Sequence, residues 1–281
     1  RRARGGGAVR RATGGLSGPA RLLAFFPGGP WGETPAATPA RLQDRGRLLA
    51  RIAEALQTLD HPAARRSHRW DLAAADQHRS RAGLVEGYDR RRCVERGFQL
   101  FVACARPGLP SLPRGPIHGD TNDENLLVDG ELLCGLVDFG DALEAPLVCE
   151  LAIALAYVLQ HGSDPLVEGA AVVGAYHAER ALTSAELRVL FPLVVARLAV
   201  TLTVCAERRR EDAEHPTWFA TEERAERRLA ELLAHEPAAG GSAWAAETGL
   251  EPFPQEGANV QELLDRRRAR IGPSLSISYR D

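Results

Sequence analysis

The chain has 281 residues and carries 35 basic and 37 acidic side chains, which gives a net charge of −2 at pH 7. This balance produces no basic surface field of the kind that holds nucleic acid, so no nucleic-acid partner is expected. The length suits one large domain or two small ones. The 5 cysteines show neither zinc nor disulfide spacing, which favours reduced thiols and a cytoplasmic location.

The beginning of the chain is rich in Gly and Arg. Residues 1–18 are expected to be a ragged N-terminal end with little structure. Within residues 19–35, the apolar run that ends at Phe26 predicts one strand, and the Pro and Gly residues after it predict a turn. The sequence contains no Lys and no Met, so every basic side chain is Arg.

Apolar periodicity and helix-breaking residues predict a series of helices. The first begins at Pro39 with Thr38 as its N-cap. The others cover residues 84–105, 147–159, 166–180, a long apolar stretch that starts at Ser184 and includes 188–206, and 221–235. Residues 188–206 are apolar enough for a membrane span, but Arg197 at their centre favours a buried helix, so no membrane partner is expected. Residues 236–258, rich in Pro, Gly and Ala, are predicted to be a linker.

A distinctive pattern lies in the middle of the chain. It consists of His118-Gly119-Asp120, then Asn125, and then Asp138. Apolar runs on either side of Asp129-Gly130 predict two short strands joined by a tight turn. A hairpin brings its outer ends together, so Asn125 and Asp138 are expected at the same open end, with a bulge near Gly135 to adjust the register. An ordinary buried hairpin flanked by solvated polar residues is the alternative.

These residue types suit phosphoryl transfer. Mg²⁺ prefers oxygen ligands, which the side chains of Asn125 and Asp138 can supply. A group that takes the proton of a hydroxyl must stay ionised near neutral pH, as a solvated Asp120 does. An Asp, an Asn and a second Asp in this order form the phosphoryl-transfer site of kinase-like enzymes.

The Gly between His118 and Asp120, with the motif Asp138-Phe139-Gly140-Asp141, resembles the aminoglycoside phosphotransferase and choline kinase superfamily. Further motifs resemble its hydroxylysine kinase branch: Phe26-Pro27-Gly28, His61-Pro62-Ala63 and Trp70-Asp71-Leu72. The resemblance covers residues 20–235. It implies an α+β, protein-kinase-like fold, mostly the helical C-terminal lobe with a truncated N-terminal lobe. Residues 19–35 are then a remnant of the small lobe and hinge, and residues 36–235 are the large lobe.

The resemblance also implies roles for individual residues. Asp120 is the expected catalytic base, and His118 beside it is favoured as a residue that shapes the catalytic loop. Asn125 and Asp138 are the expected ligands of Mg²⁺, which lies against the phosphates of ATP or GTP; the choice between the two nucleotides stays open.

Other residues are assigned to the surroundings of this site. Backbone groups of Ala24, Phe25 and Phe26 are expected to pair with the nucleotide base, although a plain buried strand explains them equally well. Asp141 is expected either to meet the ammonium group of the substrate or to bond to backbone near the metal loop. Glu150 stands where the superfamily often has an acidic residue that braces the catalytic loop.

Two features point to sequence beyond this chain. Kinase-like sites hold the nucleotide phosphates with a small-lobe Lys, and the sequence has none, so we expect most of the small lobe to be missing and the 281 residues alone to have little kinase activity. Residues 259–281 resemble the start of a class III aminotransferase that depends on pyridoxal phosphate. That cofactor would belong to a fused domain absent from this chain; a disordered basic tail is the alternative.

Three functions are compatible with these observations. The first is a phosphotransferase domain that moves the γ-phosphate of ATP or GTP to the hydroxyl of a small amine or amino acid, such as hydroxylysine. The second is a catalytically inactive module that binds substrate or nucleotide. The third is an accessory domain of a pyridoxal-phosphate aminotransferase or phospho-lyase. Because Asp120, Asn125 and Asp138 are all present, the first is favoured over the second.

Overall fold

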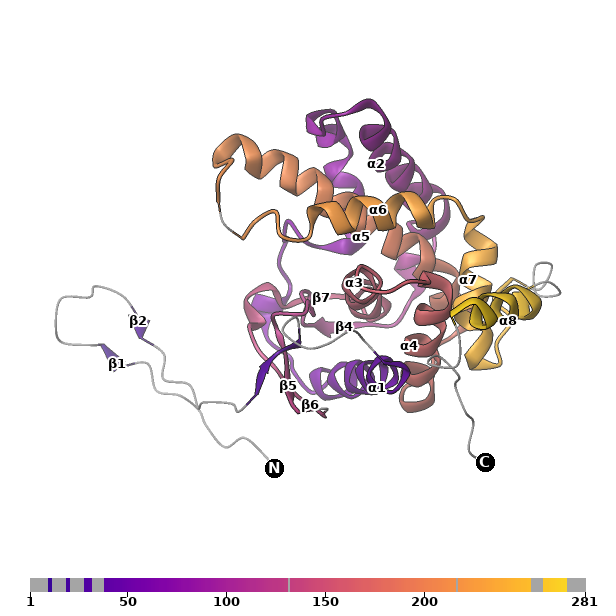
Figure 1. Cartoon of the computed structure of the whole chain (residues 1–281). Coiled ribbons are helices and arrows are strands. Elements are labelled where there is room, and N and C mark those ends of the chain that lie inside the picture. Colours follow the sequence, from indigo (N-terminus) through magenta and orange to yellow (C-terminus); the bar gives the residue numbers. More distant parts are fainter. Residues whose placement is uncertain are drawn as a thin grey trace.

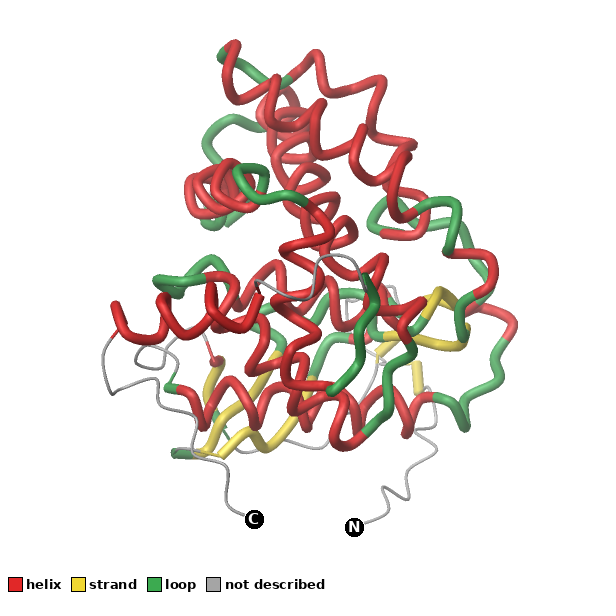
Figure 2. The backbone as a smooth tube through the Cα atoms, turned by 90° about the vertical axis from the view of Figure 1, so that its right-hand side faces the viewer, coloured by secondary structure: helices red, strands yellow, loops and turns green. Residues whose placement is uncertain are grey.

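The structure, a computed structural model, describes residues 10–11, 19–20, 28–31, 38–130, 132–215, 217–253 and 260–271. These residues form an α+β domain that is mostly helical, with its short strands in the lower part of the molecule and an upper part made of helices (Figures 1 and 2). The predicted α+β class with a dominant helical part is confirmed. Ala24, Phe25 and Phe26 lie outside the described residues.

Eight helices of the described residues build the lobe. They are α1 (Pro39–Leu56), α2 (Tyr88–Leu100), α3 (Val148–Val158), α4 (Pro165–Glu179), α5 (Ser184–Glu211), α6 (Glu222–Leu232), α7 (Pro237–Ala245) and α8 (Val260–Ile271). Single turns of 3-10 or π helix and a longer 3-10 segment, Leu72–Leu84, connect them. Helix α1 packs on α4, and α5 packs on α2, α3 and α6. The helices therefore enclose one large apolar core with α5 near its centre.

Within the described residues, the strands pair in three small antiparallel sheets. The strands are β1 (Arg10–Arg11), β2 (Pro19–Ala20), β3 (Gly29–Pro30), β4 (Arg114–Ile117), β5 (Leu126–Asp129), β6 (Leu132–Leu136) and β7 (Leu143–Pro146). Strand β1 pairs with β2, β5 lies between β3 and β6, and β4 pairs with β7. The β4–β7 pair and the β5–β6 hairpin bracket the loop that carries the central sequence motif.

Local sequence rules explain where the helices begin. The Thr38 hydroxyl accepts the N–H of Arg41 at 3.3 Å and so caps α1 as predicted. Helix α5 begins with a reciprocal capping box between Thr183 and Glu186.

Among the described helices, only α5 is long and apolar enough to cross a membrane, and 89% of its most apolar 18-residue window is buried inside the protein. The prediction of a buried helix around Arg197 is confirmed.

The predicted hairpin is present with its bulge. Leu127 faces Gly135 and Val128 faces Leu133, so Cys134 is the extra residue of β6. Gly130 has the positive φ of +60° that the tight turn requires. At the open end, the N–H of Val137 donates to the carbonyl of Asn125 at 3.0 Å. Asn125 therefore lies directly beside the residue that precedes Asp138, as the bulged register predicted.

The linker prediction for residues 236–258 is wrong over the part that the structure describes. Helix α7 packs on α4 and α5, and its Trp244 is fully buried. The indole N–H of Trp244 donates to the carbonyl of Pro165 at 2.9 Å, and its ring lies 4.9 Å from that of Phe191. A Cβ at Gly169 would collide with this indole. Small residues that resemble a flexible linker in sequence thus serve close helix packing here.

Replacing Trp244 tests whether α7 is part of the folded domain. Trp244→Ala should lower the free energy of unfolding by about 3–5 kcal/mol, because it empties a fully buried site. Trp244→Phe fills most of the space but loses the hydrogen bond to Pro165, so a smaller loss is expected. Urea unfolding measures both. Changes within about 0.5 kcal/mol of zero for both variants, as at an exposed linker, contradict the packing.

Folding stability should depend on pH through His78. The His78 side chain is buried, its Nε2 lies 2.8 Å from the carbonyl of Arg69, and its Nδ1 has no hydrogen-bond partner among the described residues. Burial lowers the pKa of His78 below its ordinary value of 6.5. Below that pH the unfolded chain binds a proton that the folded protein excludes, so stability is lost as the pH falls.

We expect His78 to remove at most about 1.4 kcal/mol of unfolding free energy per pH unit below about pH 6.5, until the lowered folded-state pKa is passed. Urea unfolding of the wild type and His78→Gln between about pH 8 and pH 5 measures this term. Gln keeps an N–H donor for the Arg69 carbonyl and does not titrate. The variant should therefore show the flatter pH profile, and identical profiles would exclude His78 as the cause.

Candidate active site

A buried carboxylate shapes the loop between β4 and β5. Glu150, at the start of α3, is completely buried and accepts the N–H of His118, the N–H of Gly119 at 3.1 Å and the Thr121 hydroxyl at 2.9 Å. Burial raises the pKa of the Glu150 carboxyl, and these donors oppose the shift. Gly119 has a φ of +82°, and a Cβ there would approach the carbonyl of Asp141 to 2.8 Å. Glu150 thus ties the turn of the loop to α3.

Both ring nitrogens of His118 are engaged with backbone. Nδ1 accepts the N–H of Asp120 at 3.3 Å, so Nε2 carries the proton and donates to the carbonyl of Val137 at 2.9 Å. The Phe139 ring stands edge-on to the imidazole, with centroids 4.6 Å apart. His118 therefore links the loop to the end of β6. This placement agrees with the shaping role favoured for it, and leaves neither nitrogen free for proton transfer.

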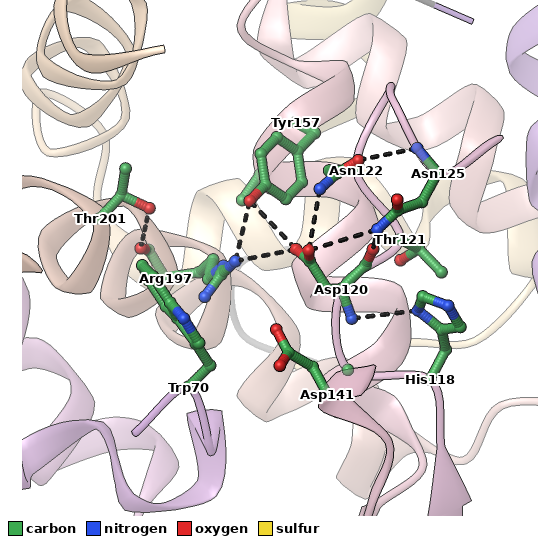
Figure 3. Close-up of polar contacts among 12 residues, drawn as sticks. Trp70, His118, Asp120, Thr121, Asn122, Asn125, Asp141, Tyr157, Arg197 and Thr201 are labelled. Atoms are coloured by element: carbon green, nitrogen blue, oxygen red, sulfur yellow. Dashed lines mark hydrogen bonds and ion pairs between the residues drawn. The ribbon is translucent and has the colours of Figure 1, made fainter. Parts of the chain in front are cut away.

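Asp120 lies at the centre of the site, where several donors converge on its carboxylate (Figure 3). Asn122 Nδ2 donates to Oδ2 at 2.9 Å, and the Tyr157 hydroxyl donates to Oδ1 at 3.3 Å. Arg197 Nη2 lies 3.5 Å from Oδ1. Burial raises the pKa of the Asp120 carboxyl above its ordinary value, and Arg197 opposes the shift. The carboxylate is thus oriented and has a stronger affinity for a proton than an exposed Asp.

Arg197 and Tyr157 were not predicted as site residues. Arg197 is only 2% exposed; its Nη2 donates to the Tyr157 hydroxyl at 2.9 Å, and its guanidinium lies 4.5 Å from the centre of the Trp70 ring. Burial raises the pKa of Tyr157 to about 12, so its hydroxyl stays protonated. The signal in the sequence was Arg197 at the centre of the long apolar stretch of α5, which indicates a buried charge with a partner.

Asn125 and Asp138 offer hard oxygen donors at the open end of the hairpin. The amide nitrogen of Asn125 donates to the Asp120 carbonyl at 2.8 Å, which leaves its side-chain oxygen available. Asp138 has a left-handed backbone, with φ 62°, and its Oδ1 accepts the N–H of Gly140 at 3.1 Å, which leaves Oδ2 available. One amide oxygen and one carboxylate oxygen fit Mg²⁺, which usually takes few protein ligands and completes its shell with water and phosphate oxygens.

The Asp141 side chain lies below that of Asp120 in the view of Figure 3. His68 Nε2 is 3.3 Å from its Oδ1. Its carbonyl oxygen faces Gly119, so the close approach of the two loops depends on that Gly. The side chain also lines the cavity beside Asp120. Of the two roles considered for Asp141, a position open to the substrate is thus compatible with the geometry.

Asp123 is a buried structural residue of the same loop. Its Oδ1 is 2.6 Å from Arg45 Nη1 on α1, and its Oδ2 is 2.6 Å from His161 Nε2. Arg45 also donates to the carbonyl of Thr121 at 3.0 Å. Burial alone would raise the pKa of Asp123, but Arg45 and His161 outweigh it and hold the pKa well below its usual range. Helix α1 is thereby attached to the loop.

A cavity of about 620 Å³ opens beside Asp120. Its walls come from the loop after β4, from Asp141, from Tyr157 of α3, from one face of α5 and from the segment that leads into α6. Ligand pockets for small molecules typically span about 300–1,000 Å³. The cavity is therefore large enough for a small molecule in contact with the Asp120 carboxylate.

The sequence of residues 4–188 matches the model of the phosphotransferase enzyme family. The chain belongs to this family. Hydroxylysine kinase from Mus musculus is 30% identical over 199 residues, which are 66% of this chain and 53% of that protein. Homoserine kinase from Rhizobium johnstonii is 32% identical over 182 residues, 63% of this chain and 54% of that protein. The chain thus spans about half the length of the curated relatives it matches.

Solved structures support the fold assignment. An aminoglycoside phosphotransferase from Alicyclobacillus acidocaldarius superposes with a TM-score of 0.51 at 19% sequence identity, covering 77% of this chain and 71% of that one. At this identity the likeness establishes a common fold. The predicted membership of the aminoglycoside phosphotransferase and choline kinase superfamily is confirmed, whereas the resemblance of residues 259–281 to an aminotransferase stays a prediction.

Two substitutions of Glu150 separate the effect of its hydrogen-bond acceptors from that of its charge. Glu150→Ala leaves the buried amides of His118 and Gly119 without an acceptor, at about 1–3 kcal/mol for each unpaired group. Glu150→Gln keeps an oxygen for both amides and can donate to Thr121, whose hydroxyl can accept as well as donate. Urea unfolding and amide hydrogen exchange should therefore reveal a much larger loss for Ala. Equal losses for the two variants would show that these hydrogen bonds do not hold the loop.

Proposed function

We propose that the protein containing this chain transfers the terminal phosphoryl group of ATP or GTP to a hydroxyl of a small amine or amino acid. The observation that carries the proposal is the Asp120 carboxylate, held by Arg197 and Tyr157 at the wall of a cavity of about 620 Å³. Asn125 and Asp138 stand at the adjoining hairpin end with oxygens available for a metal ion. Hard oxygen ligands beside a buried base are what phosphoryl transfer requires.

The chemistry assigned to these residues is a proton transfer coupled to phosphoryl transfer. The acceptor hydroxyl lies against Asp120, and its oxygen forms the new bond to the γ-phosphorus. The bond from that phosphorus to the bridging oxygen breaks, and the nucleoside diphosphate leaves with that oxygen. The hydroxyl proton passes to the Asp120 carboxylate. When bound by Asn125 and Asp138, Mg²⁺ supplies positive charge that neutralises the phosphate oxygens.

The relatives suggest the class of acceptor. Hydroxylysine kinase and homoserine kinase are named for small amino acids that carry a hydroxyl and an ammonium group. Glu124 and Asp141 give the wall of the cavity near Asp120 negative charge, which suits an ammonium group next to the reacting hydroxyl. We take 5-hydroxylysine and homoserine as the leading acceptors.

We also propose that the chain is fused to a pyridoxal-phosphate enzyme. The coding sequence downstream of this chain tests that proposal.

Substituting Asp120 in the full-length protein tests the base. Asp120→Asn keeps the size of the side chain but removes the proton acceptor, and general-base assistance is typically worth about 10²–10⁴-fold. Turnover should fall by that order while nucleotide affinity stays close to the wild-type value. The measurement combines steady-state kinetics on a panel of hydroxylated amines and amino acids with nucleotide binding by calorimetry. Unchanged turnover on every accepted compound would remove Asp120 from this role.

Substituting Asp138 should have a different signature. Asp138→Asn removes the charged metal ligand, so the affinity for the Mg²⁺–nucleotide complex should fall. A higher Mg²⁺ concentration should restore part of the lost activity, which it should not do for Asp120→Asn. Titrating activity against Mg²⁺ for both variants distinguishes the roles. If the wild-type full-length protein phosphorylated no compound of the panel, an inactive binding module would replace the present proposal.

A further inference from the structure

The far end of the cavity is cationic. Arg208, near the end of α5, and Arg224, in the first turn of α6, line the same cavity as Asp120. Near them, Arg209 pairs with Glu222, and Arg228 pairs with Glu231 at 2.7 Å. Within the described parts of the chain, neither Arg208 nor Arg224 has a carboxylate partner. Arg208 and Arg224 thus differ from Arg209 and Arg228 in having no internal counter-charge among the described residues.

Arg208 is held by two aromatic rings. Its guanidinium lies 4.9 Å from the centre of the Trp218 ring and 5.8 Å from that of Trp70. Stacking engages the faces of a guanidinium and leaves the N–H groups at its edge free to form a two-pronged contact with a carboxylate. Trp218 is itself stacked on His215, with ring centroids 4.0 Å apart. Arg208 is therefore positioned without using up its hydrogen-bond donors.

Arg224 adds a second donor group. Its Nε is buried and has no hydrogen-bond partner among the described residues. A buried donor that stays unpaired carries a free-energy cost, so a ligand that accepts from it is favoured. Its place in the first turn of α6 adds the positive end of that helix to the same region.

The cationic end is connected to the catalytic carboxylate through Trp70. Arg197 lies over the same Trp70 ring as Arg208, at 4.5 Å from its centre, and Arg197 contacts Asp120. Positions 197 and 208 on α5 are separated by about three helical turns and share one face. A small molecule that lies along the Trp70 ring can thus place one end at Asp120 and the other at Arg208.

We propose that Arg208 and Arg224 form a carboxylate site that selects hydroxy amino acids over amino alcohols as acceptors. This inference rests on the proposed function and adds the residues that set acceptor specificity. The acceptor lies along Trp70, with its hydroxyl at Asp120 and its carboxylate between the two arginines. The expected acceptor is therefore zwitterionic, and removal of its carboxylate weakens binding at the end far from the reaction.

The first experiment compares ligands that differ only in the carboxylate. Binding of homoserine and of 3-aminopropan-1-ol to the 281-residue chain is measured by calorimetry, and 5-hydroxylysine is compared in the same way with 1,5-diaminopentan-2-ol. Hydrogen bonds between charged groups predict that each amino acid binds about 10- to 100-fold more tightly than its amine. Equal affinities within both pairs, or no measurable binding of either amino acid, would overturn the inference.

Two substitutions assign the effect to the arginines. Arg208→Gln and Arg224→Gln should each weaken amino-acid binding about tenfold and should not weaken amine binding. Arg210→Gln on the same helix is the matched control, because Arg210 does not line this cavity. If Arg208→Gln fails to fold, Arg208→Lys keeps the charge and loses the two-pronged contact. Equal losses for both ligands would indicate a purely structural role and overturn the inference.

Phosphorylation by the full-length protein separates this inference from the proposed function. Faster phosphorylation of homoserine than of 3-aminopropan-1-ol, reversed or levelled by Arg208→Gln, supports both. Equal phosphorylation of the two acceptors overturns the carboxylate site and leaves the phosphotransferase function intact. Carboxylate-dependent binding without phosphorylation of any acceptor overturns the function and supports the site.

Discussion

The buried Glu150 carboxylate is the interaction on which the rest of the site depends. It accepts two successive backbone N–H groups and the Thr121 hydroxyl, and so fixes the turn at Gly119 to the start of α3. That turn sets the direction of His118, whose ring nitrogens then join the loop to the end of β6. A buried charge is tolerated only where such donors compensate its lost hydration. In Glu150 these hydrogen bonds take the place of water. The same bonds fix the turn, and the turn sets the position of Asp120.

Two aspartates of the loop are paired with basic side chains of other segments. Asp120 faces Arg197 of α5, and Asp123 faces Arg45 of α1 and His161. Each pair joins the loop to a different helix, so the loop is anchored on several sides of the core. The pairs also differ in consequence. Asp123 has its pKa held low and stays an anion bound to its partners, whereas the pKa of Asp120 is raised by burial, which suits the proton-accepting role proposed for it.

The sequence predicted the features that depend on neighbouring residues. The Thr38 cap, the bulged hairpin after Asn125 and the buried helix around Arg197 all follow from local rules of capping, turn formation and burial. It did not predict contacts between distant segments. Tyr157 and Arg197 reach Asp120 only because α3 and α5 pack side by side, and no local pattern encodes that. Helix α7 was predicted to be a linker because its small residues suit a flexible chain as well as close packing. The packing of Trp244 on Gly169 shows that they serve close packing here.

The buried helix α5 supplies much of the cavity wall. Arg197, Thr201 and Arg208 lie on one face of it and line the cavity from the Asp120 carboxylate to the cationic end. Because α5 is packed on α2, α3, α6 and α7, the spacing between these side chains is fixed by helix geometry and not by loop conformation. A rigid wall of this kind favours a ligand whose two polar ends are separated by the same distance as the polar side chains of the wall. If Arg208 binds the substrate carboxylate as proposed, selectivity comes from the rigid core, and the loop after β4 supplies the proton acceptor.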